Sequence, residues 1–204
     1  MTQQIELVIA TRNPGKLREI EGFLQGLPVQ LFSLSEFDQV PDIAEDGASF
    51  TENALKKARI VCSITGRSAL ADDSGLCVDA LDGKPGIYSA RYAGEEASDQ
   101  KNLQKLLEEM KSVPPSARTA HFVCVLALVD PNGQEKIFEG SCTGTIITRS
   151  RGNNGFGYDP VFFFEPLGLT FAQMDPVVKS TVSHRGKALR QFAAYMREAA
   201  GKHF

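Results

Sequence analysis

Residues 68–76, SALADDSGL, are the stretch from which the fold of this 204-residue chain can be worked out. The apolar residues at its start predict a short buried strand, which is followed by two adjacent carboxylates, Asp72 and Asp73. The next two residues, Ser74 and Gly75, favour a turn, so we expect the strand to end at the acids. In an open α/β sheet, ligands collect at the carboxyl ends of strands, where paired acids can hold a hard cation. An ordinary turn is the alternative for this stretch taken alone.

A second candidate site lies earlier in the chain, between a predicted strand at 5–10 and a predicted helix at 17–27. The loop between them reads Thr11-Arg12-Asn13-Pro14-Gly15-Lys16. Free backbone amides and a lysine at a helix N-terminus suit an anion, although a solvated turn would have the same composition. A Walker A loop would need a second glycine, and Ser or Thr after the lysine. Lys16 and Arg18 open the helix, where the helix dipole disfavours cations unless an anion lies nearby.

An acidic loop separates the next two elements, a strand at 29–34 and a helix from 50 to about Gly66. Ser49-Phe50-Thr51-Glu52 matches a capping box at the start of that helix. Most acids of the loop are expected to be solvated. Glu45 and Asp46 have no such local explanation, and either could reach a metal held by Asp72 and Asp73.

The middle of the chain adds antiparallel strands to this pattern. The patterns at 121–129 and 136–148 predict two strands, joined by the turn 130–133, so the sheet is expected to be mixed. The glycine-punctuated loop 83–94, which carries aromatics and cations, and the amphipathic helix 98–110 are expected to be a surface connection and scaffold. A second glycine-rich loop, 151–160, contains Phe156, which could stack on a base or belong to a plain turn.

Cations also gather before the C-terminal helix, for which Ser183 is the predicted N-cap. They are Lys179, His184, Arg185 and Lys187. The helix dipole would prefer acids at this end. Two helices that break the same charge rule indicate a shared anionic ligand, because functional sites are where local rules fail.

Composition limits the remaining choices. A net charge of -3 argues against general nucleic-acid binding, and the four widely spaced cysteines indicate neither a zinc site nor a disulfide framework. Residues 1–4 carry no basic leader, and no apolar run reaches transmembrane length. With 42% hydrophobic residues, the chain is expected to form a single domain, 1–204, in the cytoplasm, without a membrane partner.

Together these motifs resemble the inosine triphosphate pyrophosphatases, also called XTP/dITP diphosphatases, over nearly the whole chain. The blocks that carry the resemblance are residues 11–16, 49–54 with 57–58, 71–75, 85–92, 156–159 and 183–185. The resemblance implies an elongated mixed α/β sheet flanked by helices, with the nucleotide in a central cleft. It also implies a homodimer that hydrolyses non-standard purine nucleoside triphosphates (dITP, ITP and XTP) to the monophosphate and pyrophosphate, removing deaminated purines from the nucleotide pool.

The same resemblance implies roles for particular residues. Asp73 would be the proton acceptor and a ligand of Mg²⁺, with Glu45 as the second metal ligand. The substrate-binding residues would be Thr11, Arg12, Asn13, Pro14, Gly15, Lys16, Ser74, Phe156, Gly157, Tyr158, Asp159, Lys179, His184 and Arg185. Arg12, in place of the family's common glycine, and Val178, in place of a glutamate, depart from the pattern.

Two other classes of protein could use similar loops. A phosphotransferase would share the anion-binding loops, but its lysine loop should resemble a Walker A. A nucleotide sensor without catalysis would need the cations but would have no use for the paired acids. Magnesium-dependent turnover separates an enzyme from a sensor.

Overall fold

The computed structural model describes residues 5–27, 29–94 and 96–201, and in this part of the chain seven strands form one mixed sheet. The strands are β1 (Ile5–Ile9), β2 (Val29–Ser33), β3 (Ser68–Val78), β4 (Thr119–Val129), β5 (Glu135–Ile146), β6 (Phe162–Phe164) and β7 (Leu169–Thr170). Their order is β2-β1-β3-β4-β5-β6-β7. β1 is parallel to β2 and β3, whereas β6 is antiparallel to β5 and β7. The predicted mixed α/β sheet is therefore confirmed.

The helices are α1 (Pro14–Leu24), α2 (Phe50–Thr65), α3 (Asp99–Glu109), α4 (Pro176–Val182) and α5 (His184–Gly201). Within the described residues, none of them is long and apolar enough to cross a bilayer. Residues 1–4, from which the absence of a leader was inferred, lie outside the described part.

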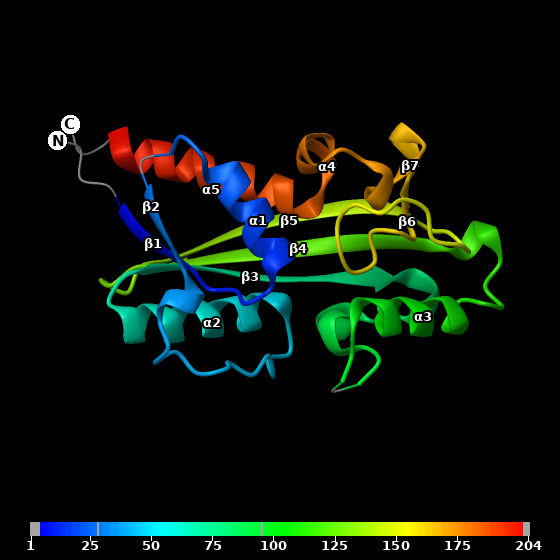
Figure 1. The fold of residues 1–204 in the computed structure, drawn as a ribbon, viewed down its shortest axis with the longest axis horizontal. Helices are drawn as coiled ribbons and strands as arrows, with labels where there is room; N and C mark the ends of the chain where they lie inside the picture. Colours follow the sequence, from blue (N-terminus) through cyan, green and yellow to red (C-terminus); the bar gives the residue numbers. More distant parts are fainter. Residues whose placement is uncertain (1–4, 28, 95, 202–204) are drawn as a thin grey trace. The chain divides into compact units, whose positions relative to one another are not determined.

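The chain divides into two compact units, each with its own apolar core. Unit 1 comprises Met1–Asp73, Cys124–Gly140 and Arg185–Phe204, and unit 2 comprises Ser74–Val123 and Ser141–His184. In unit 1, apolar side chains of α1 and α5 pack with those of β1, β3 and β4, while α2 lies on the other face of the sheet (Figure 1). In unit 2, Leu106 and Met110 of α3 belong to a core that also contains Phe162 and Phe171.

The strand predicted to end at the paired acids does not end there. β3 continues from Ser68 to Val78, so Asp72 and Asp73 lie in the middle of a strand. β1 pairs with β3 only over Ser68–Leu70, so Ser74 and Gly75 continue the strand beyond β1, on the side of the sheet where β4 is the neighbour of β3. Beyond the acids, the amide of Leu76 donates to Oγ of Ser89. The prediction of acids at a strand end was therefore wrong.

The helix signals were mostly correct. Oγ of Ser49 caps α2 by accepting from the amide of Glu52, and the helix ends at Gly66, whose φ of 65° is left-handed. The capping box is incomplete, because the Glu52 carboxylate receives the amide of Ala48 instead of that of Ser49. The short helix α4, capped by Asp175, was not predicted, and it places Ser183 at the C-terminal end of α4 as well as before α5.

The predicted hairpin is also present. The turn between β4 and β5 is closed by a hydrogen bond from the amide of Asp130 to the carbonyl of Gln134, and Gly133 has a φ of 82°. These long strands bring residues of the middle of the chain beside β3 in the sheet order.

Candidate functional site

The loop 11–16 is organised by Asn13, the N-cap of α1. Its Oδ1 accepts the amides of Gly15 and Lys16, at 2.8 and 3.1 Å, and Pro14 occupies the first helical position. Oγ1 of Thr11 accepts the amide of Asn13. The capped loop therefore has a fixed backbone, and it delivers Lys16 to a defined place.

The lysine of this loop meets the first of the paired acids. Nζ of Lys16 lies 2.5 Å from Oδ1 of Asp72, and both side chains are largely buried. A cation in the first turn of α1 is thus compensated by a carboxylate of the chain itself. The unfavourable interaction between Lys16 and the N-terminal end of the α1 dipole is therefore partly offset by Asp72, a residue of unit 1, without any ligand.

Asp72 is held by a second cation, Arg185, at the start of α5. Nε of Arg185 lies 2.8 Å from Oδ2 of Asp72, and the same guanidinium pairs with Glu19 of α1. The thiol of Cys124 also donates to Oδ2. Burial alone would raise the pKa of Asp72, but Arg185 and Lys16 outweigh that effect and hold the pKa well below its usual value. Asp72 is therefore a fixed anion that anchors two cations.

Asp73 has a different environment. Its Oδ1 is 3.1 Å from Nζ of Lys57, which also contacts the Glu45 carboxylate at 2.5 Å and the Asp72 carbonyl at 2.8 Å. Its Oδ2 is buried and has no hydrogen-bond partner among the described residues. Burial raises the pKa of Asp73, because it and the nearby Glu45 charge outweigh the opposing effect of Lys57 and Lys16. A carboxylate with a raised pKa is a better proton acceptor.

We call this group of unit 1 side chains the carboxylate cluster. Its members are Lys16, Glu19, Glu45, Lys57, Asp72, Asp73 and Arg185. Lys57 belonged to a block that carries the resemblance, but no role was predicted for it. The available signal was its position on α2, where it shares the buried face with Ala54, Ala58 and Val61. A lysine in an apolar stripe needs an acidic partner, and here it has two. Glu19 had no signal in the sequence.

Unit 2 contains the second group of predicted residues, the aromatic cluster. It consists of Phe122, Phe156, Asp159, Phe171, Lys179 and His184. Nζ of Lys179 lies 2.6 Å from Oδ2 of Asp159, and it is also 5.1 Å from the centre of the Phe156 ring. The His184 ring stacks on Phe122, with 4.6 Å between the ring centres and 12° between the planes. The cluster therefore combines flat rings with a buried cation.

The glycine-rich loop around Phe156 is fixed by hydrogen bonds within unit 2. Oδ2 of Asp159 accepts the amide of Phe156, and Oδ2 of Asp99 accepts the amide of Gly157. The hydroxyl of Tyr158 donates to the carbonyl of Ser89, and its ring lies in the core, with 5% of the residue exposed. Tyr158 therefore anchors the loop.

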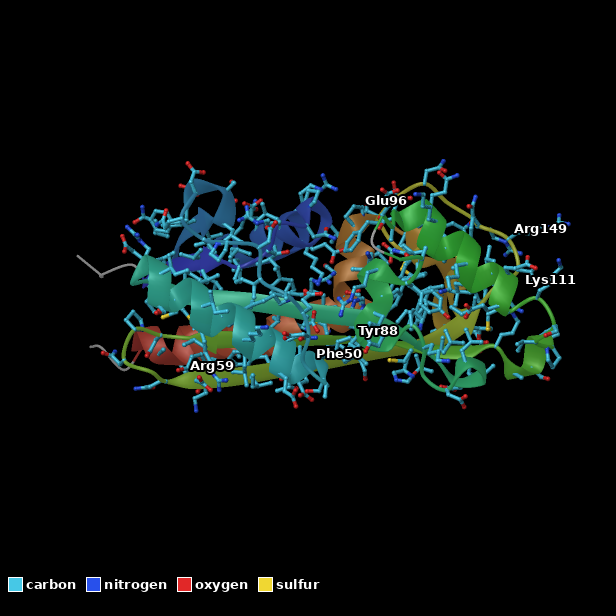
Figure 2. The ribbon with its side chains drawn as sticks, turned by 90° about the horizontal axis from the view of Figure 1, so that it is seen from below. Phe50, Arg59, Tyr88, Glu96, Lys111 and Arg149 are labelled. Carbon is cyan, nitrogen blue, oxygen red and sulfur yellow. The ribbon has the colours of Figure 1, made fainter. Side chains whose placement is uncertain are left out.

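Other predicted residues have contacts of their own. Arg12 donates to the carbonyl of Val40 and pairs with Asp42 at 3.0 Å. Ser74 lies half-buried in β3, and Lys187 is exposed. The loop 83–94 lines a surface cavity of about 350 Å³ with Tyr88, which is 55% exposed, and Arg91, whose guanidinium lies over the Tyr88 ring (Figure 2).

Possible metal ligands are few. Among the described residues, no three His, Cys, Asp or Glu side chains are grouped as a metal site would require. The ammonium of Lys57 contacts both Glu45 and Asp73. The available protein donors are thus two carboxylates, which is the number that Mg²⁺ uses when a substrate phosphate supplies further oxygens.

The chain is a mixed α/β protein whose described residues include a cluster of buried acids paired with lysines and an arginine. Comparison with known proteins is more specific. The model of the Ham1 family matches residues 7–195. A protein of Geobacter sulfurreducens named dITP/XTP pyrophosphatase is 57% identical over 183 residues, which are 90% of this chain and 92% of that protein. The chain belongs to the Ham1 family, which confirms the resemblance seen in the motifs.

Other relatives agree. A dITP/XTP pyrophosphatase of Vibrio vulnificus is 49% identical over 195 residues, which cover 95% of this chain and 97% of that protein. The solved structure of a HAM1 protein from Coxiella burnetii is similar with a TM-score of 0.87 and 43% identity, covering 96% of this chain and all of that chain. The similarity thus extends over the residues of both units.

Proposed function

We propose that this protein hydrolyses dITP, ITP and XTP to the nucleoside monophosphate and pyrophosphate, and so removes deaminated purines from the nucleotide pool. The observation that carries the proposal is the environment of Asp73, in a chain that belongs to the Ham1 family. One oxygen of this buried carboxylate has no hydrogen-bond partner among the described residues, its pKa is raised, and lysines lie around it. A base of this kind beside cations suits attack of water on a polyphosphate.

In the proposed reaction, Asp73 takes one proton from the attacking water. The water oxygen forms a bond to the α-phosphorus, and the bond from that phosphorus to the oxygen bridging to the β-phosphate breaks. The bridging oxygen leaves with pyrophosphate, and the monophosphate keeps the new oxygen. The loop 11–16, through the ammonium group of Lys16, and the ammonium group of Lys57 bind the phosphates, so that charge on the leaving group is compensated.

The donor set fits Mg²⁺. Asp73 offers a buried oxygen with no partner among the described residues, and Glu45 offers a second carboxylate 2.5 Å from Nζ of Lys57. Asp73 and Glu45 would hold the ion, which, when bound, neutralises phosphate charge and lowers the pKa of water. Lys57 contacts both carboxylates, so we expect its ammonium to shift toward the phosphates when the ion binds.

Base recognition is assigned to the aromatic cluster. Phe156 offers a ring for stacking, and Lys179 and His184 offer hydrogen-bond donors for the carbonyl at position 6 of hypoxanthine or xanthine. Adenine has an amino group at this position, so a donor would face a donor. Arg185 was expected beside the nucleoside, but its guanidinium binds Asp72 and Glu19 and only 2% of the residue is exposed. We therefore assign the Arg185 side chain to holding Asp72.

A nucleotide panel tests the function. With Mg²⁺ present, dITP, ITP and XTP should be hydrolysed with kcat/KM at least about 10²-fold above dATP, the scale that a hydrogen-bond mismatch supports. The same ratio is expected against dGTP, but guanine shares the carbonyl at position 6, so its exclusion requires a separate contact or steric restriction near position 2. Pyrophosphate and phosphate are assayed separately, and pyrophosphate should be the product. Equal kcat/KM for dITP and dATP would contradict the assigned base recognition, and release of single phosphates would contradict the reaction. Binding without turnover would instead support a sensor.

The proposal also includes a homodimer, a cytoplasmic location, and no nucleic-acid or membrane partner, as the family resemblance implies. Sedimentation of the purified chain at several concentrations tests the dimer. A single species with the mass of one chain would contradict it.

A further inference from the structure

The acidic segment before α2 lies along the first two turns of that helix in a regular order. Going forward through the segment, Glu45 contacts Lys57, Asp46 contacts Lys56, Gly47 contacts Asn53 and Ala48 contacts Glu52. The partners thus run backward along α2 as the segment runs forward. Figure 2 shows this helix, with Phe50 at its first residue and Arg59 further along. Four consecutive residues of the segment therefore contact four residues of α2, taken in reverse order along the helix.

Two of these contacts, Asp46–Lys56 and Ala48–Glu52, are exposed, whereas Glu45–Lys57 and Gly47–Asn53 are partly buried. Asp46 and Lys56 are 69% and 36% exposed, and surface ion pairs of this kind contribute little. Asn53 is fully buried, and its Oδ1 accepts the amide of Gly47 at 2.8 Å. A buried amide oxygen without its donor costs much more than an exposed pair. Of the two partly buried contacts, the Gly47–Asn53 hydrogen bond is the one made by the backbone of the segment, so we take it as the contact that fixes the alignment.

Gly47 also has no room for a side chain. A Cβ at this position would lie 2.8 Å from Oδ1 of Asn53 and 2.9 Å from Cβ of Glu52. Real Cβ atoms essentially never come this close to other atoms. The segment can approach the helix this closely only because residue 47 is a glycine, whose lack of a Cβ permits close contact of the backbone.

The alignment decides which acid faces Asp73. In the observed register, Glu45 meets Lys57, which is 3.1 Å from Oδ1 of Asp73, while Asp46 meets the solvated Lys56. A shift of one residue along α2 would present Asp46 in place of Glu45. The shorter Asp46 side chain would then have to reach the same position.

We propose that Asn53 is a positioning residue, which fixes Gly47 on α2 and thereby places Glu45, and not Asp46, as the second carboxylate beside Asp73. The inference rests on the proposed function, because it concerns the Mg²⁺ ligands of that site. Asn53 acts through the backbone of Gly47 and touches neither phosphate nor water in the proposed reaction. Its loss should therefore weaken Mg²⁺ binding more than it lowers turnover at saturating Mg²⁺.

The test compares Asn53→Ala and Gly47→Ala with the unaltered chain. In each variant, the Mg²⁺ concentration for half-maximal turnover should rise roughly 10- to 100-fold, the usual effect of losing a residue that orients a metal ligand. At saturating Mg²⁺, kcat should return to within about threefold of the original value. A threefold difference in kcat corresponds to about 0.7 kcal/mol in the activation free energy, as expected for a residue that takes no part in the reaction. In the double variant, the Mg²⁺ concentration for half-maximal turnover should be close to that of the more impaired single variant, because both substitutions remove the same Gly47–Asn53 contact.

Two measurements do not depend on turnover. Isothermal titration calorimetry with Mg²⁺ alone should show weaker binding in both variants, and hydrogen exchange at the Gly47 amide should be faster in Asn53→Ala. Ser49→Ala is the matched control, because it removes the cap of α2 without touching Gly47, and it should destabilise the fold while leaving the Mg²⁺ dissociation constant unchanged.

The neighbouring acids provide the second comparison. Glu45→Gln should weaken Mg²⁺ binding, and Asp46→Asn should change it by less than about twofold, because Asp46 is paired only with an exposed lysine. Unchanged Mg²⁺ binding in Asn53→Ala, or equal losses in Glu45→Gln and Asp46→Asn, would overturn the inference. If the unaltered chain hydrolyses no nucleotide, the proposed function fails, and the calorimetry still decides the role of Asn53.

Discussion

Asp72 and Asp73 are adjacent in the sequence but have opposite electrostatic environments. Because successive residues of a strand point to opposite faces, Asp72 meets Lys16 and Arg185, while Asp73 meets Lys57. The two cations lower the pKa of Asp72, and burial raises that of Asp73. Two carboxylates whose pKa values are pushed apart are suited to two roles, one as a structural anion and one as a base.

Replacing Asp73 by Asn tests the assigned base. The side chain keeps its shape and loses its basicity, so kcat for dITP should fall roughly 10²- to 10⁴-fold, the usual contribution of a general base. Substrate affinity in the absence of Mg²⁺, measured as the dissociation constant of dITP, should change little, because Asp73 is not assigned a direct contact with the phosphates. A variant that folds normally by circular dichroism and turns over dITP at nearly the original rate would show that Asp73 is not the base.

Replacing Lys16 by Ala is a test in which the sequence and the structure predict different effects on stability. The helix dipole alone predicts that losing a cation from the first turn of α1 leaves stability unchanged or improves it. The buried contact with Asp72 predicts the reverse, a loss of about 1–3 kcal/mol, because a buried carboxylate loses one of its partners. Turnover of dITP should fall as well.

The control for Lys16 is Arg18→Ala, which removes an exposed cation near the start of α1. Urea denaturation measures stability, and it should show little change for this variant. If Lys16→Ala is as stable as Arg18→Ala and retains activity, Lys16 neither supports Asp72 nor binds phosphate.

At the scale of elements, the loops are held by polar side chains that accept backbone amides close to them in the sequence. Asn13 caps α1, Asn53 fixes the segment before α2, and Asp159 receives both Lys179 and the amide of Phe156. Each of these polar side chains satisfies a backbone amide that no regular ladder satisfies. The loops are consequently set in place before a ligand arrives, which lowers the cost of binding.

Gly155→Ala tests the preformed loop of the aromatic cluster. Gly155 has a φ of 77°, and a Cβ there would overlap the carboxylate of Asp159. Asp159 must move, so its contacts with Lys179 and Phe156 are disturbed, and the preference in kcat/KM for dITP over dATP should fall by about tenfold or more. Nucleotide competition assays with both substrates measure the preference.

Gly133→Ala is the matched control, because Gly133 has a φ of 82° and open space around its Cα. Both variants carry the strain of a left-handed residue, and only Gly155→Ala also displaces Asp159. An equal loss of preference in the two variants would contradict a specific role of the Asp159 contacts.

At the scale of the whole molecule, three strands belong to both compact units. β3 passes from unit 1 to unit 2 between Asp73 and Ser74, and β4 and β5 cross the same division. Leu70 and Leu76 of β3 are fully buried, one in the core of each unit. Unfolding one unit would therefore interrupt strands of the other, and we expect the chain to behave as a single domain.

Leu70→Ala and Leu76→Ala test this expectation. Each substitution should lower the free energy of unfolding by about 2–5 kcal/mol, the usual effect of a large-to-small change in a core. Calorimetry and urea denaturation should show one transition in both variants, displaced as a whole. Two transitions, of which Leu70→Ala shifts one and Leu76→Ala the other, would show two independent domains.

The sequence by itself determined the mixed α/β fold, the order of most elements, the hairpin and the family. These depend on local signals such as apolar periodicity, caps and turns, which are fixed by neighbouring residues. It also indicated the paired acids, the cationic loop 11–16 and the cluster before α5. It could not determine the end of β3, because residues that prefer turns continue the strand beyond its pairing with β1, where β4 is the neighbouring strand.

Only the tertiary structure decided how the charged residues are paired. Arg185 and Asp72 are 113 residues apart, and no local pattern links a lysine on α2 to two acids on separate segments. These pairings matter because the charges are buried. A charge removed from water is strongly destabilising unless an opposite charge lies beside it, and only the folded chain brings such distant residues together. The sequence therefore supplied the acids and the cations, and the packing of α1, α2 and α5 on the sheet paired Asp72 with Lys16 and Arg185 and placed Asp73, the proposed base, beside Lys57.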